Sequence, residues 1–196
     1  TRLINGYGPT ENTTFTCCHQ IKATDLSGGS IPIGKPIAHT DVLVLDAQRR
    51  RVAIGVVGEL YTGGDGLARG YIGEPEFTAQ AFGAHPDDAN RRIYRTGDLV
   101  RWREDGTLEF KGRADRQVKI RGHRIELTEV EAALAGVVGV TAATVVVDTT
   151  ASRKRLVGYA ASALAASEVQ AQLATQLPDY LVPSVIITLP SLPLTA

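Results

Sequence analysis

Apolar and polar residues alternate along the first part of the chain, in short runs separated by glycine and proline. Alternation with a period of two predicts strands, because successive side chains of a strand point to opposite faces. The predicted strands occupy residues 41–46, 51–57, 58–63, 99–103 and 107–111. Glu104-Asp105-Gly106 lies between the last two and predicts a hairpin turn. One short helix is predicted over residues 75–82, where Pro75 suits the first helical turn.

The pattern changes after Gly112. Two short basic strands flank Arg121-Gly122-His123 and predict a second hairpin. Thr128 is expected to open a helix, with Glu131 completing a capping box. Apolar residues recur every four positions over 168–177, which predicts a further helix ended by Pro178. Strands rich in valine, isoleucine and alanine are predicted at 141–148, 155–161 and 185–189.

These elements predict an α+β chain in two parts. Residues 1–114 form a β-rich, distorted barrel-like part. Residues 115–196 form a small α+β part with the element order β-β-α-β-β-α-β. The second part has roughly 80 residues, near the lower limit for a self-sufficient core.

The segment at residues 5–15 combines turn-forming residues with polar chemistry. Gly6 and Gly8 flank Tyr7, and Pro9 stiffens the backbone that follows. We expect a strand, a rigid loop and a second strand over 13–17, with polar groups at the loop tip. Such a loop suits a flat, phosphate-bearing ligand, because it offers an amide, a stacking face, a hydroxyl and a carboxylate. These groups belong to Asn5, Tyr7, Thr10 and Glu11.

Composition narrows the possible partners. The 196 residues carry 21 Lys and Arg against 21 Asp and Glu, so no global charge favours nucleic acid or a membrane surface. No apolar run approaches the ~20 residues of a membrane helix. Cys17 and Cys18 are adjacent on a predicted strand and point to opposite faces, which indicates small core residues rather than a disulfide or a metal pair. We therefore expect a cytoplasmic protein.

Five segments carry a resemblance to a known family. NGYGPTE at residues 5–11 is similar to the nucleotide-binding loop of the adenylation domains of nonribosomal peptide synthetases, in the adenylate-forming superfamily. Residues 59–71, 94–102 and 112–134 resemble later motifs in the family's order, and residues 177–195 resemble the segment before its final motif. The resemblance covers essentially the whole chain.

The resemblance implies a C-terminal portion of an adenylation domain. Residues 1–114 correspond to the last part of the large subdomain, and residues 115–196 to the small lid subdomain. The family's phosphate-gripping loop is absent, and its catalytic lysine is expected after Ala196. The fragment alone is therefore expected to be inactive, with no catalytic residue of its own.

The resemblance also assigns a nucleotide site for ATP with Mg²⁺. It places Asn5 near the adenine amine, Thr10 at phosphate and Glu11 on the metal. Three residues have a structural alternative. Tyr7 is either an adenine platform or a loop-packing aromatic, and Glu11 is either a Mg²⁺ ligand or an ordinary strand-end carboxylate. Asp98 either accepts the ribose hydroxyls or is an Asx-type turn residue. The nucleotide-binding set is Asn5, Tyr7, Thr10, Asp98, Phe110 and Arg113. Phe110 stands where many members carry a tyrosine, so a hydrogen bond from that hydroxyl to ribose is lost or replaced.

The basic hairpin is the second assigned region. Asp115 resembles the family's hinge, about which the lid subdomain pivots between two reactions. Lys119, Arg121 and Gly122 resemble the loop that approaches the phosphopantetheine arm of a peptidyl carrier protein, and glycine leaves room for that arm. The alternative for this charged stretch is a solvated hairpin face. The glycine cluster at residues 63–70 lacks the Lys-Ser/Thr of a phosphate loop and is interpreted as a structural turn.

Three residues point to a substrate. Gly6, Thr14 and Phe15 fall at pocket-lining positions of the family, and the combination resembles valine-type pockets for branched aliphatic amino acids. Two other functions stay open. One is an acyl-CoA ligase or luciferase-like relative; the other is a non-catalytic module that binds a carrier protein or an MbtH-like helper.

Overall fold

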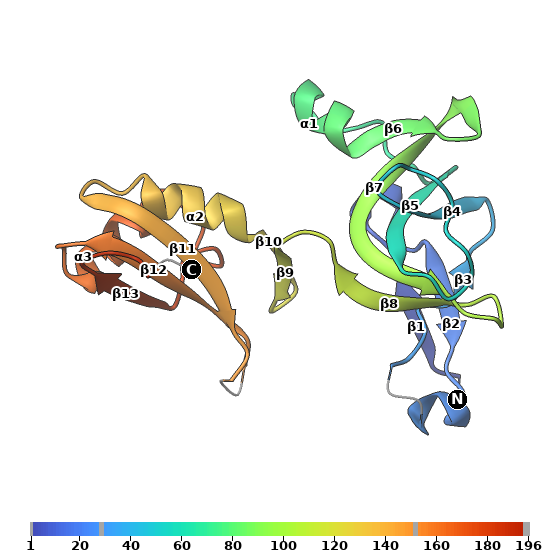
Figure 1. The fold of residues 1–196 in the computed structure, drawn as a ribbon, viewed down its shortest axis with the longest axis horizontal. Helices are drawn as coiled ribbons and strands as arrows, with labels where there is room; N and C mark the ends of the chain where they lie inside the picture. The colour runs from blue at the N-terminus through green and yellow to red at the C-terminus, as the bar shows by residue number, and fades with distance from the viewer. Residues whose placement is uncertain (1, 28–29, 151–152, 194–196) are drawn as a thin grey trace. The chain divides into compact units, whose positions relative to one another are not determined.

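The computed structural model describes residues 2–27, 30–150 and 153–193. The chain divides into two compact units, Thr1–Asp115 and Arg116–Ala196. The division falls one residue after the boundary expected from the sequence. Each unit has its own sheets (Figure 1). Each also has its own buried core.

The first unit contains two antiparallel sheets. The small sheet has the strand order β1-β2-β3, and the larger one has the order β4-β5-β7-β6, with β8 also paired to β7. The strands of the small sheet are β1 (Ile4–Tyr7), β2 (Cys17–Gln20) and β3 (Lys35–Pro36). Those of the larger sheet are β4 (Thr40–Leu45), β5 (Gly58–Gly64), β6 (Phe82–His85), β7 (Asp88–Trp102) and β8 (Leu108–Arg113). Helix α1 (Pro75–Ala81) precedes β6, and single turns of 3-10 helix form at Thr10–Asn12 and Ala23–Ser27.

Hydrogen bonds join the two sheets. The Ile33 amide donates to the Leu108 carbonyl at 2.9 Å, and the Leu108 amide donates to the Gly34 carbonyl at 2.8 Å. Gly34 has φ +97, and a Cβ there would lie 2.0 Å from the Cys18 carbonyl oxygen, so only glycine fits this junction. The shared core contains Cys17, Ile33, Val44, Leu60, Val100 and Leu108. The small sheet is therefore packed with the large one into a single unit.

Three expectations for this unit need correction. Residues 51–57 do not form a strand; Arg51 makes only an isolated bridge to Leu45. The strand expected at 13–17 begins only at Cys17, because Thr13 and Thr14 take left-handed conformations (φ 46 and 66) that cannot continue an extended ladder. The strand expected at 99–103 is the end of β7, a strand of 15 residues that pairs with β5, β6 and β8.

The second unit follows the predicted order of elements. It contains β9 (Gln117–Ile120), β10 (His123–Glu126), α2 (Leu127–Ala135), β11 (Val140–Asp148), β12 (Arg155–Ser162), α3 (Ala166–Ala174) and β13 (Val185–Leu189). Strands β9 and β10 form the expected hairpin. The other three strands form a sheet of order β11-β12-β13, in which β11 and β12 are antiparallel and β12 and β13 are parallel.

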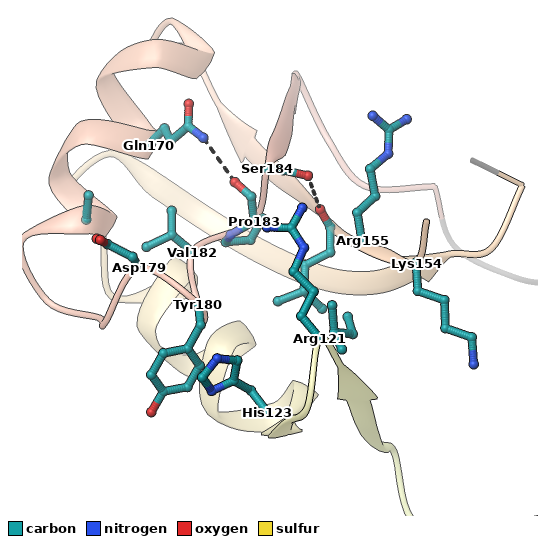
Figure 2. Close-up of a pocket in the computed structure, with 13 residues that line it drawn as sticks. Arg121, His123, Lys154, Arg155, Gln170, Asp179, Tyr180, Val182, Pro183 and Ser184 are labelled. Atoms are coloured by element: carbon teal, nitrogen blue, oxygen red, sulfur yellow. Dashed lines mark hydrogen bonds between the residues drawn. The ribbon is translucent and has the colours of Figure 1, made fainter. Parts of the chain in front are cut away.

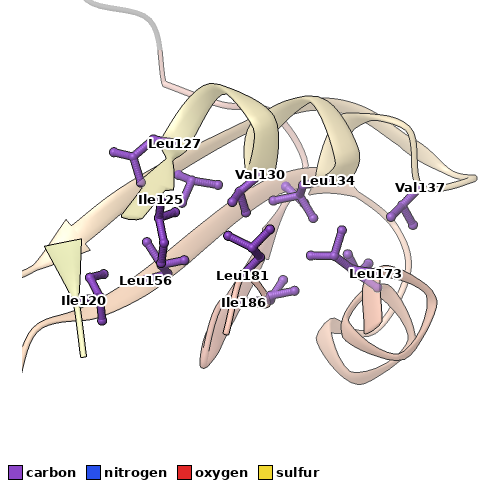
Figure 3. Close-up of a cluster of buried hydrophobic side chains, with 13 residues drawn as sticks. Ile120, Ile125, Leu127, Val130, Leu134, Val137, Leu156, Leu173, Leu181 and Ile186 are labelled. Atoms are coloured by element: carbon purple, nitrogen blue, oxygen red, sulfur yellow. The ribbon is translucent and has the colours of Figure 1, made fainter. Parts of the chain in front are cut away.

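One apolar cluster fills the second unit. Helix α2 contributes Leu127, Val130 and Leu134, and α3 contributes Val169 and Leu173 to the same cluster as the sheet (Figure 3). The apolar periodicity predicted over 168–177 is confirmed by Val169 and Leu173, although the helix ends at Ala174.

The predicted capping box of α2 is wrong. No side chain caps the first turn of this helix, which begins at Leu127. Glu131 instead accepts hydrogen bonds from the Thr144 hydroxyl and the Val145 amide, both at 2.8 Å, and from Arg116 at 2.8 Å. A carboxylate can accept hydrogen bonds from the first turn of a helix or from a neighbouring strand. Here the donors on β11, Thr144 and Val145, hold the Glu131 carboxylate.

The α+β, strand-rich fold class is confirmed. Among the described residues, no helix is long and apolar enough to cross a membrane. Cys17 and Cys18 are both free thiols, and burial raises the pKa of Cys17 to about 12. Cys17 therefore remains a neutral core residue at physiological pH.

Candidate functional site

A polar network connects the ends of β1 and β8 with the interior of β7. Asp98 lies opposite Arg113 in the β7–β8 register and is only 8% exposed. Its carboxylate accepts a hydrogen bond from the Tyr7 hydroxyl and another from Arg113 Nη1 at 2.6 Å. Gly97, with φ +74, makes room for this network, because a Cβ there would lie 2.5 Å from Arg113 Nη2 and 2.6 Å from Asp115 Oδ2. The structure thus brings together three predicted nucleotide-site residues and the predicted hinge residue.

Arg113 is the centre of this network. Its Nε and Nη2 donate to the two carboxylate oxygens of Asp115 at 2.7 and 2.6 Å, and Nη2 also donates to the Thr96 carbonyl at 3.1 Å. The planar guanidinium suits such simultaneous contacts with two carboxylates. Burial, reinforced by the charge of Asp98, raises the pKa of Tyr7, so the phenol stays protonated and donates to that carboxylate.

The loop after β1 is held by a buried asparagine that the sequence analysis did not single out. Asn12 is 1% exposed, and its Nδ2 donates to Thr62 Oγ1 of β5 at 2.6 Å. The Thr16 amide closes the loop by donating to the Tyr7 carbonyl at 2.7 Å. Asn5 is fixed as well, since its Nδ2 donates to the Pro32 carbonyl at 2.8 Å. No short-range sequence signal marks Asn12, because its partner in β5 is 50 positions away.

The glycine-rich segment after β5 lies against this loop. The Ala68 amide donates to the Glu11 carbonyl at 2.8 Å, and Thr13 Oγ1 donates to the Gly66 carbonyl at 2.7 Å. The Tyr71 hydroxyl reaches the Glu11 carboxylate, with Oη and Oε1 separated by 2.8 Å. The segment predicted as a structural turn therefore also holds the loop that carries Glu11.

A metal ion would find few protein ligands here. The described residues contain no group of three or more His, Cys, Asp or Glu side chains that could hold one. Glu11 offers a single, partly exposed carboxylate on the loop. This donor set fits Mg²⁺, which commonly takes one or two carboxylates and completes its shell with substrate phosphates and water.

Two of the predicted substrate residues are in contact. A Cβ on Gly6 would lie 2.5 Å from Phe15 Cε1, so the Phe15 ring covers the position where a larger side chain would project. Phe15 is 49% exposed, and Thr14, which precedes it, is exposed as well. Among the remaining predicted residues, Thr10 opens the 3-10 turn, and Phe110 lies on β8 opposite Val100. Neither the Thr10 side chain nor the Phe110 side chain takes part in the hydrogen bonds around Asp98 and Asn12.

The second unit places the basic hairpin beside a cavity. Arg121 and Gly122 form its turn with φ +52 and +85, and a cavity of about 560 Å³ opens next to it. Arg121 and His123 line this cavity, and Figure 2 shows the His123 ring stacked against the Tyr180 ring. The two ring centroids are 4.2 Å apart. Lys154 and Arg155 line the same cavity. Lys119 lies on β9, and neither it nor Gly122 is among the lining residues.

Comparison with known proteins identifies the family. Residues 1–72 match the family model described as AMP-binding enzyme, and residues 129–196 match that of the AMP-binding enzyme C-terminal domain. The chain belongs to the AMP-binding enzymes. The first matched segment lies within the first unit of this AMP-binding protein, and the second lies within the second unit.

Its relatives are peptide synthetases of much greater length. The chain is 50% identical over 200 residues to a linear gramicidin synthase polypeptide of Brevibacillus parabrevis, covering 98% of this chain and 4% of that relative. It is 47% identical over 198 residues to a plipastatin synthase polypeptide of Bacillus subtilis (strain 168), covering 99% of this chain and 8% of that relative. The chain therefore spans a small share of each relative.

A solved structure agrees over both units. Holo-PA1221, an NRPS protein containing adenylation and PCP domains bound to a vinylsulfonamide inhibitor, matches with a TM-score of 0.89 and 40% identity. The match covers 100% of this chain and 34% of that protein. The resemblance to adenylation domains read from the sequence is confirmed.

Proposed function

We propose that the chain is part of an amino-acid-activating adenylation unit of a peptide synthetase. In this reaction a carboxylate oxygen of the amino acid attacks the α-phosphate of ATP, forming an aminoacyl adenylate and releasing pyrophosphate. A carrier-protein phosphopantetheine thiol then attacks the carbonyl carbon, forming a thioester and releasing AMP. The relatives support this class of chemistry, since they are named as synthases of gramicidin and plipastatin.

The observation that carries the proposal is the Asp98 carboxylate held between Tyr7 and Arg113. A carboxylate has about four acceptor positions, and the contacts with the Tyr7 hydroxyl and Arg113 Nη1 account for one at each oxygen. The carboxylate is therefore fixed in direction and still able to accept two ribose hydroxyls. Arg113 forms an ion pair with Asp98 at 2.6 Å and would place positive charge beside the nucleotide.

Glu11 is the proposed protein ligand of the divalent cation. Bound at the phosphates, Mg²⁺ would neutralise charge that develops during attack at the α-phosphate. Glu11 is hydrogen-bonded to the segment at residues 68–71 through both its backbone carbonyl and its side-chain carboxylate. Tyr7 and Asn5 would receive the adenine ring, and Thr10 a phosphate oxygen.

Asp115 is the proposed hinge between the two half-reactions. Arg113 binds its carboxylate within the first unit. On the next residue, Arg116 binds Glu131 at 2.8 Å and the Val145 carbonyl at 2.9 Å within the second unit. Each side of the hinge is thus anchored by its own arginine, which confines backbone rotation to the bonds joining residues 115 and 116.

The basic hairpin of the second unit would serve the thiol-transfer step. Arg121, Lys154 and Arg155 outnumber Asp179 among the charged residues that line the neighbouring cavity, which suits the phosphate of a phosphopantetheine arm. Gly122 has nothing within 4 Å of the position that a Cβ would take, so the turn presents open backbone to that arm. We propose that this hairpin binds a peptidyl carrier protein. An MbtH-like helper is a further proposed partner.

The proposed substrate is valine or another branched aliphatic amino acid. The contact between Gly6 and Phe15 forms an apolar wall next to Thr14. A single methylene is worth only about 1–3 kcal/mol in such a pocket, so valine and isoleucine would be poorly separated.

Amino-acid-dependent ATP–pyrophosphate exchange tests the proposal. The complete protein that contains this chain should exchange label with valine or isoleucine, and Asp98→Asn should reduce the rate at least tenfold, because an amide accepts ribose hydroxyls less well. Exchange with charged or aromatic amino acids only would refute the substrate. Fatty-acid-dependent exchange followed by CoA thioester formation would replace the function with that of an acyl-CoA ligase.

A further inference from the structure

The Tyr71 side chain approaches the loop that carries Glu11 from a segment 60 positions later in the chain. Its hydroxyl donates to Glu11 Oε1 at 2.8 Å. Tyr71 is 37% exposed and Glu11 is partly exposed, so this hydrogen bond contributes little net stability in water. Its main physical effect is to fix the direction of the carboxylate.

Tyr71 is itself held by its surroundings. Its amide donates to Thr78 Oγ1 of α1 at 2.9 Å, and its ring packs edge-on against Phe82 with centroids 5.7 Å apart and an interplanar angle of 71°. Phe82 is buried and lies 5.0 Å from the ring of Tyr94, which is also buried. The hydroxyl is therefore placed by the core of the first unit.

Glu11 is held at two points by one segment. The Ala68 amide binds its backbone carbonyl at 2.8 Å, and Tyr71 binds its carboxylate. A protonated phenol facing a carboxylate can only donate, which fixes the polarity of the contact.

We propose that Tyr71 is a positioning residue that aims the Glu11 carboxylate at the divalent cation of the bound nucleotide. The inference rests on the proposed function, in which Glu11 is the metal ligand. Hydrogen-bond donors to metal-binding carboxylates orient the ligand, and their removal commonly weakens metal binding by about 10–100-fold. Here the nucleotide phosphates supply other ligands, so we expect the lower end of that range.

Tyr71→Phe in the complete protein tests the proposal, because it removes the hydroxyl and keeps the ring. The affinity for Mn²⁺ in the presence of ATP should fall about tenfold. It is measured from the EPR signal of the free Mn²⁺. In the exchange assay the Mg²⁺ activation constant should rise by a similar factor, while the KM for the amino acid stays within twofold. Tyr61→Phe is the matched control, since the Tyr61 hydroxyl faces a different carboxylate, Glu59, at 3.5 Å; it should leave both metal constants unchanged.

The outcomes separate this inference from the proposed function. Unchanged Mn²⁺ binding in Tyr71→Phe overturns the positioning role, even where wild-type exchange is normal. Equal weakening in Tyr71→Phe and Tyr61→Phe overturns it too, because the cause is then general loosening of the sheet. If Glu11→Gln leaves Mn²⁺ binding unchanged, Glu11 is not a metal ligand, and the positioning role of Tyr71 is refuted with it. Lack of exchange by the wild-type protein refutes the proposed function, while the Mn²⁺ measurement still decides the role of Tyr71.

Discussion

The second unit buries its apolar side chains in one cluster drawn from two helices and a sheet, whereas those of the first unit form two smaller clusters. The first unit also holds the buried polar side chains, including Asn12, Thr62, Thr96 and Asp98. Among the described residues, Gln117 is the only buried polar residue of the second unit. Apolar packing thus stabilises the second unit, while part of the interior of the first unit is occupied by hydrogen-bonded polar side chains. Mutations should therefore separate stability from chemistry according to the unit they affect.

The largest effect on folding is expected from the core of the second unit. Leu134→Ala removes a fully buried side chain and should reduce the free energy of unfolding by about 3–5 kcal/mol. Far-UV circular dichroism during urea unfolding would follow the loss. Trp102 is the single tryptophan of the chain and belongs to β7, so its fluorescence reports the first unit, and its midpoint should stay unchanged. Val138→Ala, at an 80% exposed position, is the control; an equal loss there would contradict the comparison.

Asp98→Asn should reverse the pattern. The substitution keeps the shape but removes the charge that faces Arg113, so the first unit should lose about 2 kcal/mol of stability. Trp102 fluorescence should shift to a lower urea midpoint, while the second unit unfolds as before. Asp88→Asn changes a carboxylate on the same strand that accepts a local hydrogen bond from the Asn90 amide. A similar shift in both variants would show that charge on β7, rather than the network, matters.

The hydrogen bonds of Glu131 should make the stability of the second unit depend on pH. Burial raises its pKa, but the hydrogen bonds from the Val145 amide, Thr144 and Arg116 outweigh burial and leave the pKa below its usual value. A lowered folded-state pKa contributes stability that is present above the unfolded pKa, about 4.3, and is lost as pH falls through the folded value. Glu131→Gln should therefore cost about 1–2 kcal/mol at pH 7, and the difference from wild type should shrink below pH 4. A difference independent of pH in urea unfolding would contradict the assignment.

Gly122→Ala gives the smallest expected change in folding. Its φ of +85 disfavours alanine, but nothing lies within 4 Å of the added Cβ, so the cost should be about 1 kcal/mol. In the complete protein, pyrophosphate exchange should remain normal while thioester formation slows. Gly34→Ala, by contrast, would bring the added Cβ within 2.0 Å of the Cys18 carbonyl oxygen and should destabilise the first unit more than Gly122→Ala destabilises the second. Slowing of both half-reactions in Gly122→Ala would argue against a role confined to thiol transfer.

The predictive power of the sequence differed between the units. In the second unit the element order and the apolar face of α3 followed from local sequence patterns, because regular elements pack there around one compact core. In the first unit the expected strands at 51–57 and 13–17 were wrong, since left-handed residues and isolated bridges interrupt extended runs there. Glu131 shows the same limit in the second unit, where a capping motif read locally was overruled by donors on β11.

The sequence by itself determined the α+β class, the family motifs and the residues Tyr7, Asp98, Arg113 and Asp115 that meet in one network. The tertiary structure alone decided that Asn12 anchors its loop on Thr62 and that Tyr71 holds Glu11. The reason is the distance along the chain. Periodicity and turn chemistry act over a few residues, whereas the Asn12, Tyr71 and Tyr7 side-chain bonds join positions 50, 60 and 91 residues apart. Such partners become neighbours only when the sheets assemble.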